Sequence, residues 1–245
     1  MNVTLISYTQ PTEAFLKKNN VEVASAEQIL IYVARVTSSR ENKLEDYVGL
    51  LNYLMRNSHW SPFEHAYFTF EIETSRAIGR QLLRHRSFTF QEFSQRYSEA
   101  TEMESIEFRK QAENNRQSST ERLASLLYKD NEFIYSYLVN GEVDNDFSKL
   151  TALMNAKRAL SDIQEAYKAL VDNGFSRETA RFILPETTQT TIHMTGNLRS
   201  WIHFLQIRED EHAQKEIRKI AKEIKSQLIP YAENTIKAYN KYLKQ

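Results

Sequence analysis

The densest group of residues able to bind an anion lies between positions 76 and 96. It contains one acidic residue, Glu92, and five arginines: Arg76, Arg80, Arg84, Arg86 and Arg96. If this segment begins as a helix, the first three arginines share one face and repel one another. A bound phosphate would offset the repulsion, because guanidinium groups bind phosphate through paired hydrogen bonds. The alternative is a solvated arginine face paired with acids elsewhere in the fold.

The residues that follow favour a phosphomonoester as the anion. Residues 87–97 are predicted to run extended, so that every second side chain faces the same way. Glu92, Ser94 and Arg96 then lie on one face, and a hydroxyl beside a guanidinium suits a terminal phosphate. Ser94 has no base beside it in the sequence, so it is only a weak candidate for a nucleophile.

A second set of candidates lies on a predicted helix over residues 198–207, which is apolar almost all round. Arg199 and His203 lie on it and Arg208 follows it directly. A charged side chain on a buried helix needs a partner or a ligand. The alternative to a ligand is an ion pair with an acid such as Glu209.

The other histidines are not expected to form a metal site. His65, His193 and His212 are interpreted as structural or surface residues. His212 and Glu216 are four positions apart, as metal ligands on a helix can be, but a third ligand at suitable spacing is missing.

Composition excludes several classes of protein. The 245 residues carry formal net charge zero and contain no cysteine and only five glycines. A thiol nucleophile, a zinc ribbon and an iron–sulfur cluster are therefore excluded, and no glycine-rich phosphate loop is present. No apolar run predicts a membrane span or a signal peptide, and the expected location is cytoplasmic.

The elements that must position these residues are mostly helical. Ser25 and Gln28 form a capping-box pattern before the first predicted helix, and Pro230 predicts a kink in the last. Helices are predicted at 29–36, 44–57, 76–85, 146–172, 176–183, 198–207 and from about 211, and extended segments at 2–8, 68–73 and 187–195.

Several motifs together resemble the family of flavin-dependent thymidylate synthases. Arg84-His85-Arg86, followed after seven residues by Ser94 and then Arg96, is similar to the family signature. The resemblance runs from about Ala34 to Glu216, and residues 106–146 form a longer, variable segment. The supporting matches are His59-Trp60-Ser61-Pro62-Phe63-Glu64-His65, Ala180-Arg181 through Leu184-Pro185, Asn197-Leu198-Arg199-Ser200, Leu205-Gln206-Ile207-Arg208, Asp210, His212, Ala213, Gln214 and Glu216.

The resemblance implies an α+β fold: a helix-dominated single domain over residues 1–245 with a small, mostly antiparallel sheet. It implies reductive methylation of dUMP to dTMP, with methylenetetrahydrofolate as carbon donor, NADPH as hydride source, FAD as cofactor and no metal. The lack of cysteine agrees with this, because the flavin route needs no thiolate on the enzyme. Family members are homotetramers, so a homotetramer is expected.

The resemblance also assigns residues to each ligand. Arg208 is the expected catalytic residue, because a fixed cation beside N3 of the uracil stabilises the anion that develops there. His203 stands where some relatives have asparagine. The expected FAD contacts are His59, Ser61, Arg84, His85, Arg86, Glu92, Asn197, Leu198, Arg199 and His203. The expected dUMP contacts are Gln81, Leu82, Leu83, Arg84, Glu92, Phe93, Ser94, Gln95, Arg96, Arg181 and Arg208.

Two other functions stay open at this point. Residues 84–97 interleave arginines with Phe88, Phe90, Phe93 and Tyr97, as in a single-stranded nucleic-acid-binding module that stacks bases. Zero net charge argues against a nucleic-acid binder that works through bulk electrostatics, and neither nucleic acid nor a membrane is an expected partner. The chain is alternatively a non-catalytic relative that keeps FAD and has lost methyl transfer.

Overall fold

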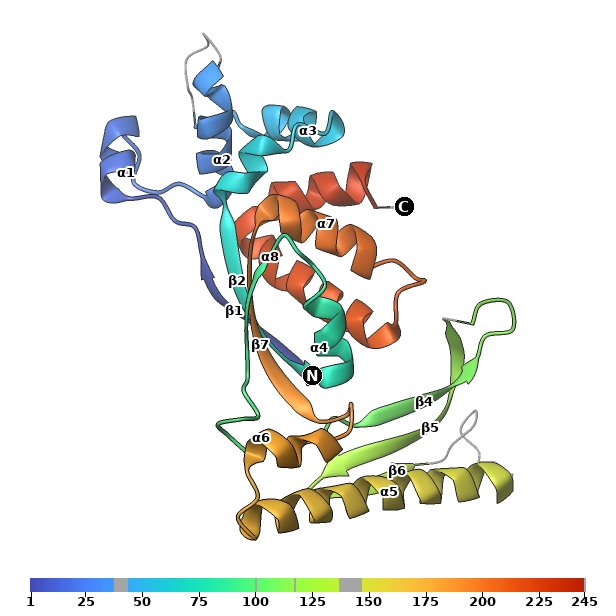
Figure 1. Cartoon of the computed structure of the whole chain (residues 1–245). Helices are drawn as coiled ribbons and strands as arrows, with labels where there is room; N and C mark the ends of the chain where they lie inside the picture. Colours follow the sequence, from blue (N-terminus) through green and yellow to red (C-terminus); the bar gives the residue numbers. More distant parts are fainter. Residues whose placement is uncertain (38–43, 100, 117, 137–146, 245) are drawn as a thin grey trace. The chain divides into compact units, whose positions relative to one another are not determined.

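The computed structural model describes residues 1–37, 44–99, 101–116, 118–136 and 147–244 (Figure 1). The helices are α1 (Glu13–Asn19), α2 (Ala26–Ala34), α3 (Val48–Arg56), α4 (Arg76–Leu82), α5 (Phe147–Asp172), α6 (Arg177–Ala180), α7 (Leu198–Arg208) and α8 (Lys215–Tyr242), with short 3-10 helices η1 (Arg35–Thr37), η2 (Ser61–His65) and η3 (Arg181–Ile183). The strands are β1 (Asn2–Tyr8), β2 (Tyr67–Ser75), β3 (Thr89–Glu92), β4 (Ile106–Gln111), β5 (Ser119–Lys129), β6 (Glu132–Ser136) and β7 (Gln189–Asn197).

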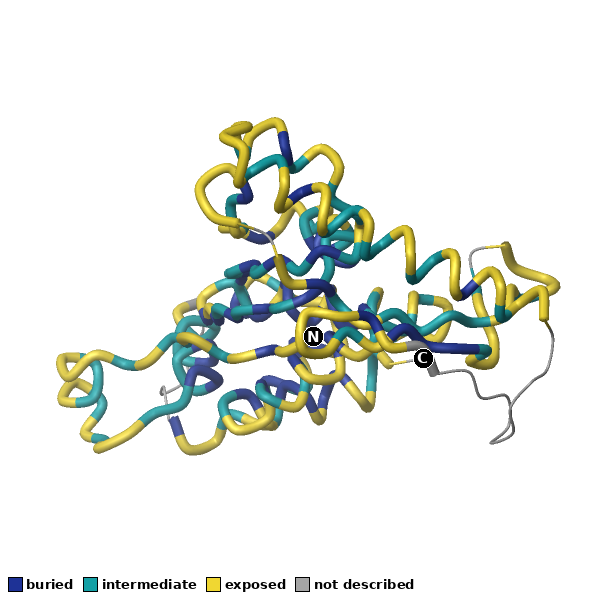
Figure 2. The backbone as a smooth tube through the Cα atoms, turned by 90° about the horizontal axis from the view of Figure 1, so that it is seen from below, coloured by how far each residue is buried: buried dark blue, intermediate teal, exposed yellow. Residues whose placement is uncertain are grey.

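The chain divides into two compact units. The terminal unit comprises residues 2–72, 82–91 and 192–245, and the middle unit comprises residues 1, 73–81 and 92–191. A four-stranded sheet has the order β1-β2-β7-β3, and β2 and β7 contribute residues to both units. Figure 2 marks the buried residues along the backbone; in β2 and β7 they recur at every second position, as in strands that bury one face.

In the terminal unit, α7 is fixed to the sheet through Trp201. The indole N–H is fully buried and donates to the carbonyl oxygens of Phe68 in β2 (3.2 Å) and Gly196 in β7 (3.1 Å). The ring packs edge-on against Phe70 and Phe88. Because a buried donor must be paired, these contacts set the start of α7 relative to the two strands.

Helix α8 covers α7, α3 and β1 with an apolar face that includes Ile217, Ile220 and Ile224. Its backbone is non-helical at Ala232 (φ −147°, ψ 45°), two residues after Pro230, so the predicted kink is confirmed. Buried Glu27 of α2 accepts a hydrogen bond from the backbone N–H of Thr235 (2.6 Å). Its carboxylate thereby caps the second half of α8, as an N-cap residue does.

In the middle unit, β4, β5 and β6 form an antiparallel sheet packed against α5. The β5–β6 turn consists of Asp130 and Asn131, both with positive φ (52° and 64°), which favours a tight hairpin. Met103, Leu126 and Phe133 form the core under α5. Residues 106–136 of the predicted variable segment therefore include this sheet, and residues 137–146 lie outside the described residues.

The helix-dominated α+β fold is confirmed, as are the capping box at Ser25 and the helix end at Gly174, which has φ 84°. Three local predictions are wrong. Helix α3 begins at Val48, not near 44. Helix α4 ends at Leu82, so Arg84 does not share a helix face with Arg76 and Arg80. The prediction that residues 1–245 form one domain stays a prediction.

The third error concerns the extended segment at 87–97. Strand β3 ends at Glu92, and the chain then turns, because the backbone N–H groups of Tyr97 and Ser98 both donate to the carbonyl oxygen of Ser94. Glu92, Ser94 and Arg96 are therefore not placed on one strand face.

Candidate functional site

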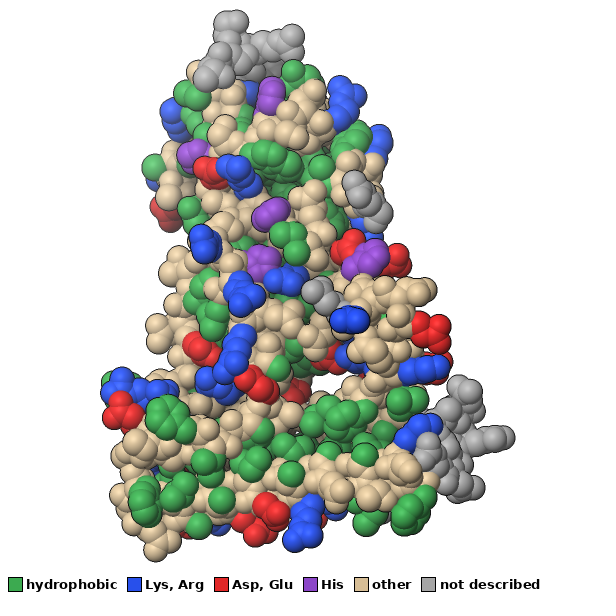
Figure 3. Space-filling view, turned by 45° about the vertical axis from the view of Figure 1, so that its right-hand side comes forward, with side chains coloured by type: hydrophobic (Ala, Val, Ile, Leu, Met, Phe, Trp, Pro, Cys, Tyr) green, Lys and Arg blue, Asp and Glu red, His purple; other side chains and the backbone are tan. Residues whose placement is uncertain are grey.

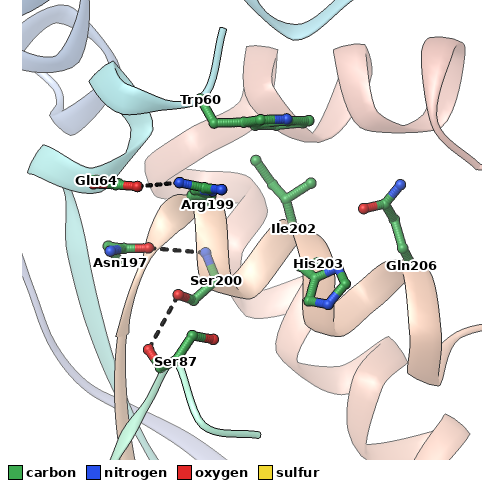
Figure 4. Close-up of a pocket in the computed structure, with 9 residues that line it drawn as sticks. All are labelled: Trp60, Glu64, Ser87, Asn197, Arg199, Ser200, Ile202, His203 and Gln206. Atoms are coloured by element: carbon green, nitrogen blue, oxygen red, sulfur yellow. Dashed lines mark hydrogen bonds and ion pairs between the residues drawn. The ribbon is translucent and has the colours of Figure 1, made fainter. Parts of the chain in front are cut away.

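A pocket of about 450 Å³ lies in the terminal unit, between η2 and α7. Its volume falls within the range of small-molecule sites, about 300–1,000 Å³. Figure 4 shows side chains from both elements around it. The lining residues are Trp60, Glu64, Ser87, Asn197, Arg199, Ser200, Ile202, His203 and Gln206.

One wall of the pocket is polar and charged. The Arg199 guanidinium forms an ion pair with Glu64, and both side chains are partly exposed. Asn197 caps α7 by accepting from the Ser200 backbone N–H (2.9 Å), and the Ser200 hydroxyl donates to the Ser87 carbonyl oxygen (3.2 Å). The caps fix the helix start, and Arg199 supplies a cation at the pocket surface.

The remaining wall combines aromatic, apolar and polar side chains. Trp60 precedes η2 and packs against Phe63, with ring centroids 5.7 Å apart. Figure 4 shows the Trp60 ring above Ile202, with His203 and Gln206 further along the same helix. An aromatic surface beside a guanidinium fits a ligand that joins a planar heterocycle to an anionic group. A flavin nucleotide has this chemistry, so the residues fit a part of it.

Arg208, at the end of α7, contacts His85. The arginine Nε donates to His85 Nε2 over 2.9 Å. Burial, then the nearby charge of Arg208 and that of His203, lower the pKa of His85 from 6.5 to about 4. Burial also lowers the pKa of Arg208.

The face drawn in Figure 3 carries histidine side chains beside Lys and Arg side chains.

In the middle unit, two of the arginines predicted to contact dUMP touch the same residue. Arg96 forms an exposed ion pair with the Glu178 carboxylate (3.0 Å), and the Nε of Arg181 donates to the Glu178 carbonyl oxygen (3.2 Å). Gln95 is buried and accepts from Arg76 (2.9 Å). Its Nε2 has no hydrogen-bond partner within the part of the chain that the structure describes.

Glu92 accepts from the Thr190 hydroxyl (3.0 Å), and Ser94 is half-buried. Arg80 forms an exposed ion pair with Glu186 (2.7 Å). The interpretation of the arginine group as a paired, solvated face therefore holds for Arg80 in this structure, and the Arg96 guanidinium also has an acidic partner.

The structure brings some of the predicted site residues together, and others lie outside the pocket lining. Asn197, Arg199 and His203 line one pocket, and His85 contacts Arg208. The predicted residues of the terminal unit outside the pocket lining are His59, Ser61, Leu82, Leu83, Arg84, His85, Arg86, Leu198 and Arg208; those of the middle unit are Gln81, Glu92, Phe93, Ser94, Gln95, Arg96 and Arg181.

Leu82 and Leu198 are fully buried, so neither is exposed to a ligand in this structure. His59 packs edge-on against Tyr53. Helix α7 is not buried all round, because Arg199 and His203 are exposed; the prediction of a buried helix is wrong at these two positions.

The sequence did not single out Trp60, Glu64, Ile202 or Gln206 as lining residues. A signal was present, because Arg199, Ile202, His203 and Gln206 follow at three- and four-residue spacing on one helix face. Ser87 and Ser200 also line the pocket and were not predicted.

The remaining candidates have local partners. His193 contacts Glu71 (3.0 Å) and His212 contacts Asp210 (2.9 Å). Phe88 is 8% exposed and packs against Trp201, so its ring cannot stack on a base in this conformation. Among the described residues, no group of three or more acidic or histidine side chains could hold a metal ion, and no helix is long and apolar enough to cross a membrane.

Comparison with known proteins gives consistent matches along most of the chain. Residues 4–232 match the family described as "Thymidylate synthase complementing protein". The flavin-dependent thymidylate synthase of Synechocystis sp. is 39% identical over 222 residues, covering 90% of this chain and 91% of that protein. A probable flavin-dependent thymidylate synthase of Paramecium bursaria Chlorella virus 1 is 37% identical over 220 residues, covering 88% of each chain.

A solved structure is similar as well. The UMP/dUMP methylase PolB from Streptomyces cacaoi, bound with 5-Br dUMP, aligns with a TM-score of 0.70 and 26% identity, covering 98% of this chain and 95% of that one.

Proposed function

Because this chain belongs to the family of flavin-dependent thymidylate synthases, we propose that it methylates dUMP to dTMP, using methylenetetrahydrofolate as carbon donor and NADPH as the source of reducing equivalents, with FAD as cofactor. The methylase PolB, whose solved structure contains 5-Br dUMP, supports dUMP as the substrate. Reduced FAD supplies the hydride that completes the methyl group. The protein then has to bind, orient and polarise the reactants.

The pocket between η2 and α7 supports FAD as the cofactor. It gathers Asn197, Arg199 and His203, three residues expected to contact FAD, around a wall that includes Trp60. Arg199 provides a cation for a phosphate group, and the aromatic and apolar wall suits a planar ring. The other proposed FAD contacts are His59, Ser61, Arg84, His85, Arg86, Glu92 and Leu198.

For the substrate, we assign Arg208 to N3 of the uracil ring. A guanidinium there stabilises negative charge at N3, which makes C5 more nucleophilic. Ser94 and Arg96 are assigned to the phosphate. The other proposed dUMP contacts are Gln81, Leu82, Leu83, Arg84, Glu92, Phe93, Gln95 and Arg181. We also propose that residues 1–245 act as one family domain within a homotetramer, to be measured by sedimentation velocity.

Tritium release from dUMP labelled at C5 tests the proposed reaction. The purified protein is stripped of flavin and assayed with methylenetetrahydrofolate and NADPH, with and without added FAD, and dTMP is quantified in the same samples. We expect tritium release and dTMP formation that both require FAD. The proposal is overturned if flavin-loaded protein forms no dTMP, as a non-catalytic relative would.

A further inference from the structure

Directly after Arg208, a nearly buried carboxylate joins the end of α7 to α8. The side chain of Glu209 is 4% exposed and accepts hydrogen bonds from Lys225, from Lys244 (2.8 Å) and from the Tyr239 hydroxyl (3.3 Å). The Lys225 side chain is 16% exposed and that of Lys244 is 43% exposed. Burial raises the pKa of Glu209, but the two lysines outweigh this and the net shift is downward.

This ionic cluster begins where the apolar packing of α7 ends. Leu198, Trp201, Phe204 and Leu205 are fully buried, whereas Gln206 and Ile207 are exposed. In the last turn of the helix, residues 205–208, only Leu205 is fully buried. Glu209 is its C-cap residue, with its backbone N–H bonded to the Leu205 carbonyl oxygen (2.9 Å).

Arg208 thus lies between two fixed points. Its side chain contacts His85, and the next residue along the backbone is held by three donors from α8 and the segment after it. A small movement of a positioned charge weakens its interaction with a substrate strongly, so the anchor of the backbone matters for the site.

We infer that Glu209 is a positioning residue for Arg208: together with Lys225, Lys244 and Tyr239 it holds the last turn of α7 so that the Arg208 guanidinium meets the uracil ring of dUMP. The inference rests on the proposed function, since it assumes that Arg208 binds dUMP. Glu209 itself is not assigned any contact with the substrate.

The first measurement compares Glu209→Gln with Glu233→Gln in the FAD-loaded enzyme. Glu233 is a matched control, because it also pairs with a lysine of α8 (Lys237, 2.7 Å) but is exposed. Calorimetric titration with dUMP gives the Kd, and flavin absorbance gives the cofactor content. We expect Glu209→Gln to raise the Kd for dUMP by about 5- to 10-fold, a range that coupled neighbours show. Flavin content should not change, and Glu233→Gln should leave the Kd unchanged.

A double-mutant cycle with Arg208→Lys separates positioning from general destabilisation. If Glu209 acts through Arg208, Glu209→Gln has less than about a 2-fold effect on the Kd in the Arg208→Lys background. An equal effect in both backgrounds overturns the inference, as does an equal effect of Glu233→Gln. If Arg208→Lys alone leaves the Kd unchanged, the assignment of Arg208 to dUMP fails first, and the inference fails with it.

Lys244→Met provides a milder variant in case Glu209→Gln folds poorly. Its side chain is partly exposed, and its removal leaves Lys225 and Tyr239 on the carboxylate. We expect a smaller rise in the Kd for dUMP that again disappears in the Arg208→Lys background. A rise that persists there contradicts the inference.

Discussion

The Nε of Arg208 donates a hydrogen bond to Nε2 of His85 over 2.9 Å, although both residues are basic. An arginine side chain has only donors, so the accepting nitrogen of His85 must carry a lone pair. The imidazole is therefore neutral and holds its proton on Nδ1. Burial, the charge of Arg208 and that of His203 favour this form, and they lower the pKa of His85 to about 4.

This contact predicts a pH dependence of stability. In the unfolded chain His85 binds a proton near pH 6.5, whereas in the folded protein it does so only near pH 4. The free energy of unfolding should therefore decrease as the pH falls from about 6.5 to about 4, and the contribution of His85 is complete above that window. Denaturant unfolding between pH 4 and 7 measures it.

His85→Gln keeps an acceptor for Arg208 and removes the titrating group. We expect its stability to depend less on pH than that of the parent protein. His212→Gln serves as the control, because His212 is an exposed histidine. If the free energy of unfolding of His85→Gln decreases as steeply with falling pH as that of the parent protein, a group other than His85 causes the decrease.

Arg208→Ala should abolish most turnover and leave flavin bound. Removing one preorganised group that stabilises developing charge typically lowers kcat by about 10²- to 10³-fold. Tritium release reports turnover, and flavin absorbance after gel filtration reports the cofactor. Normal turnover of this variant would refute the role of Arg208 at N3.

Substitutions of Arg199 and Glu64, which form one ion pair, should differ in their effect on flavin retention. Arg199→Ala removes the cation of the pocket and leaves the Glu64 carboxylate without it. We expect this variant to lose flavin during gel filtration. Glu64→Gln breaks the same ion pair but leaves the Arg199 guanidinium in place, so this variant should retain flavin. Equal loss from both variants would mean that the pair only supports the fold.

Glu178 should compete with dUMP for Arg96, because its carboxylate forms an exposed ion pair with that guanidinium. Exposed pairs contribute about 0.2–1 kcal/mol, so Glu178→Gln should lower the Kd for dUMP by about 1.5- to 5-fold. Asp162→Asn, which breaks an exposed pair with Arg158 on α5, is the control. An unchanged or higher Kd for Glu178→Gln would argue against a phosphate at Arg96.

Local patterns predicted much of the fold. The extended segments at 68–73 and 187–195 and the capping signals at Ser25 and Gly174 depend on neighbours within a few residues, and the structure confirms them. The motifs likewise led to the family and to Asn197, Arg199 and His203 as pocket residues. Each of these features could be predicted because it depends on residues that lie close together in the sequence.

Other features depend on contacts that no local pattern encodes. Ser94 and Arg96 were expected on one strand face, but the Ser94 carbonyl oxygen accepts from Tyr97 and the chain turns. Trp60 joins the pocket only because η2 packs beside α7. The exposed side of α7 was missed because its sequence is largely apolar, and burial was inferred from composition alone.

Gly196→Ala should destabilise the terminal unit. A Cβ at this position would lie 2.4 Å from Cδ1 of Phe88, whose ring packs against Trp201 and His85. Overpacking of this kind costs about 1–3 kcal/mol. Gly49→Ala in α3 meets nothing within 4 Å and should be neutral or stabilise by about 0.4–1 kcal/mol. Urea unfolding compares the two, and equal midpoints would contradict the predicted clash.

The two tryptophans occupy different environments, and the chain contains no others. Trp60 lines the pocket, whereas Trp201 is fully buried against the sheet. Their emission should therefore separate two events in one sample. A ligand that contacts Trp60 in the pocket should quench the fluorescence of this residue most strongly, whereas a red shift of Trp201 emission reports water reaching the core. With Trp60→Phe and Trp201→Phe to assign each signal, the protein carries its own optical probes for binding and for unfolding.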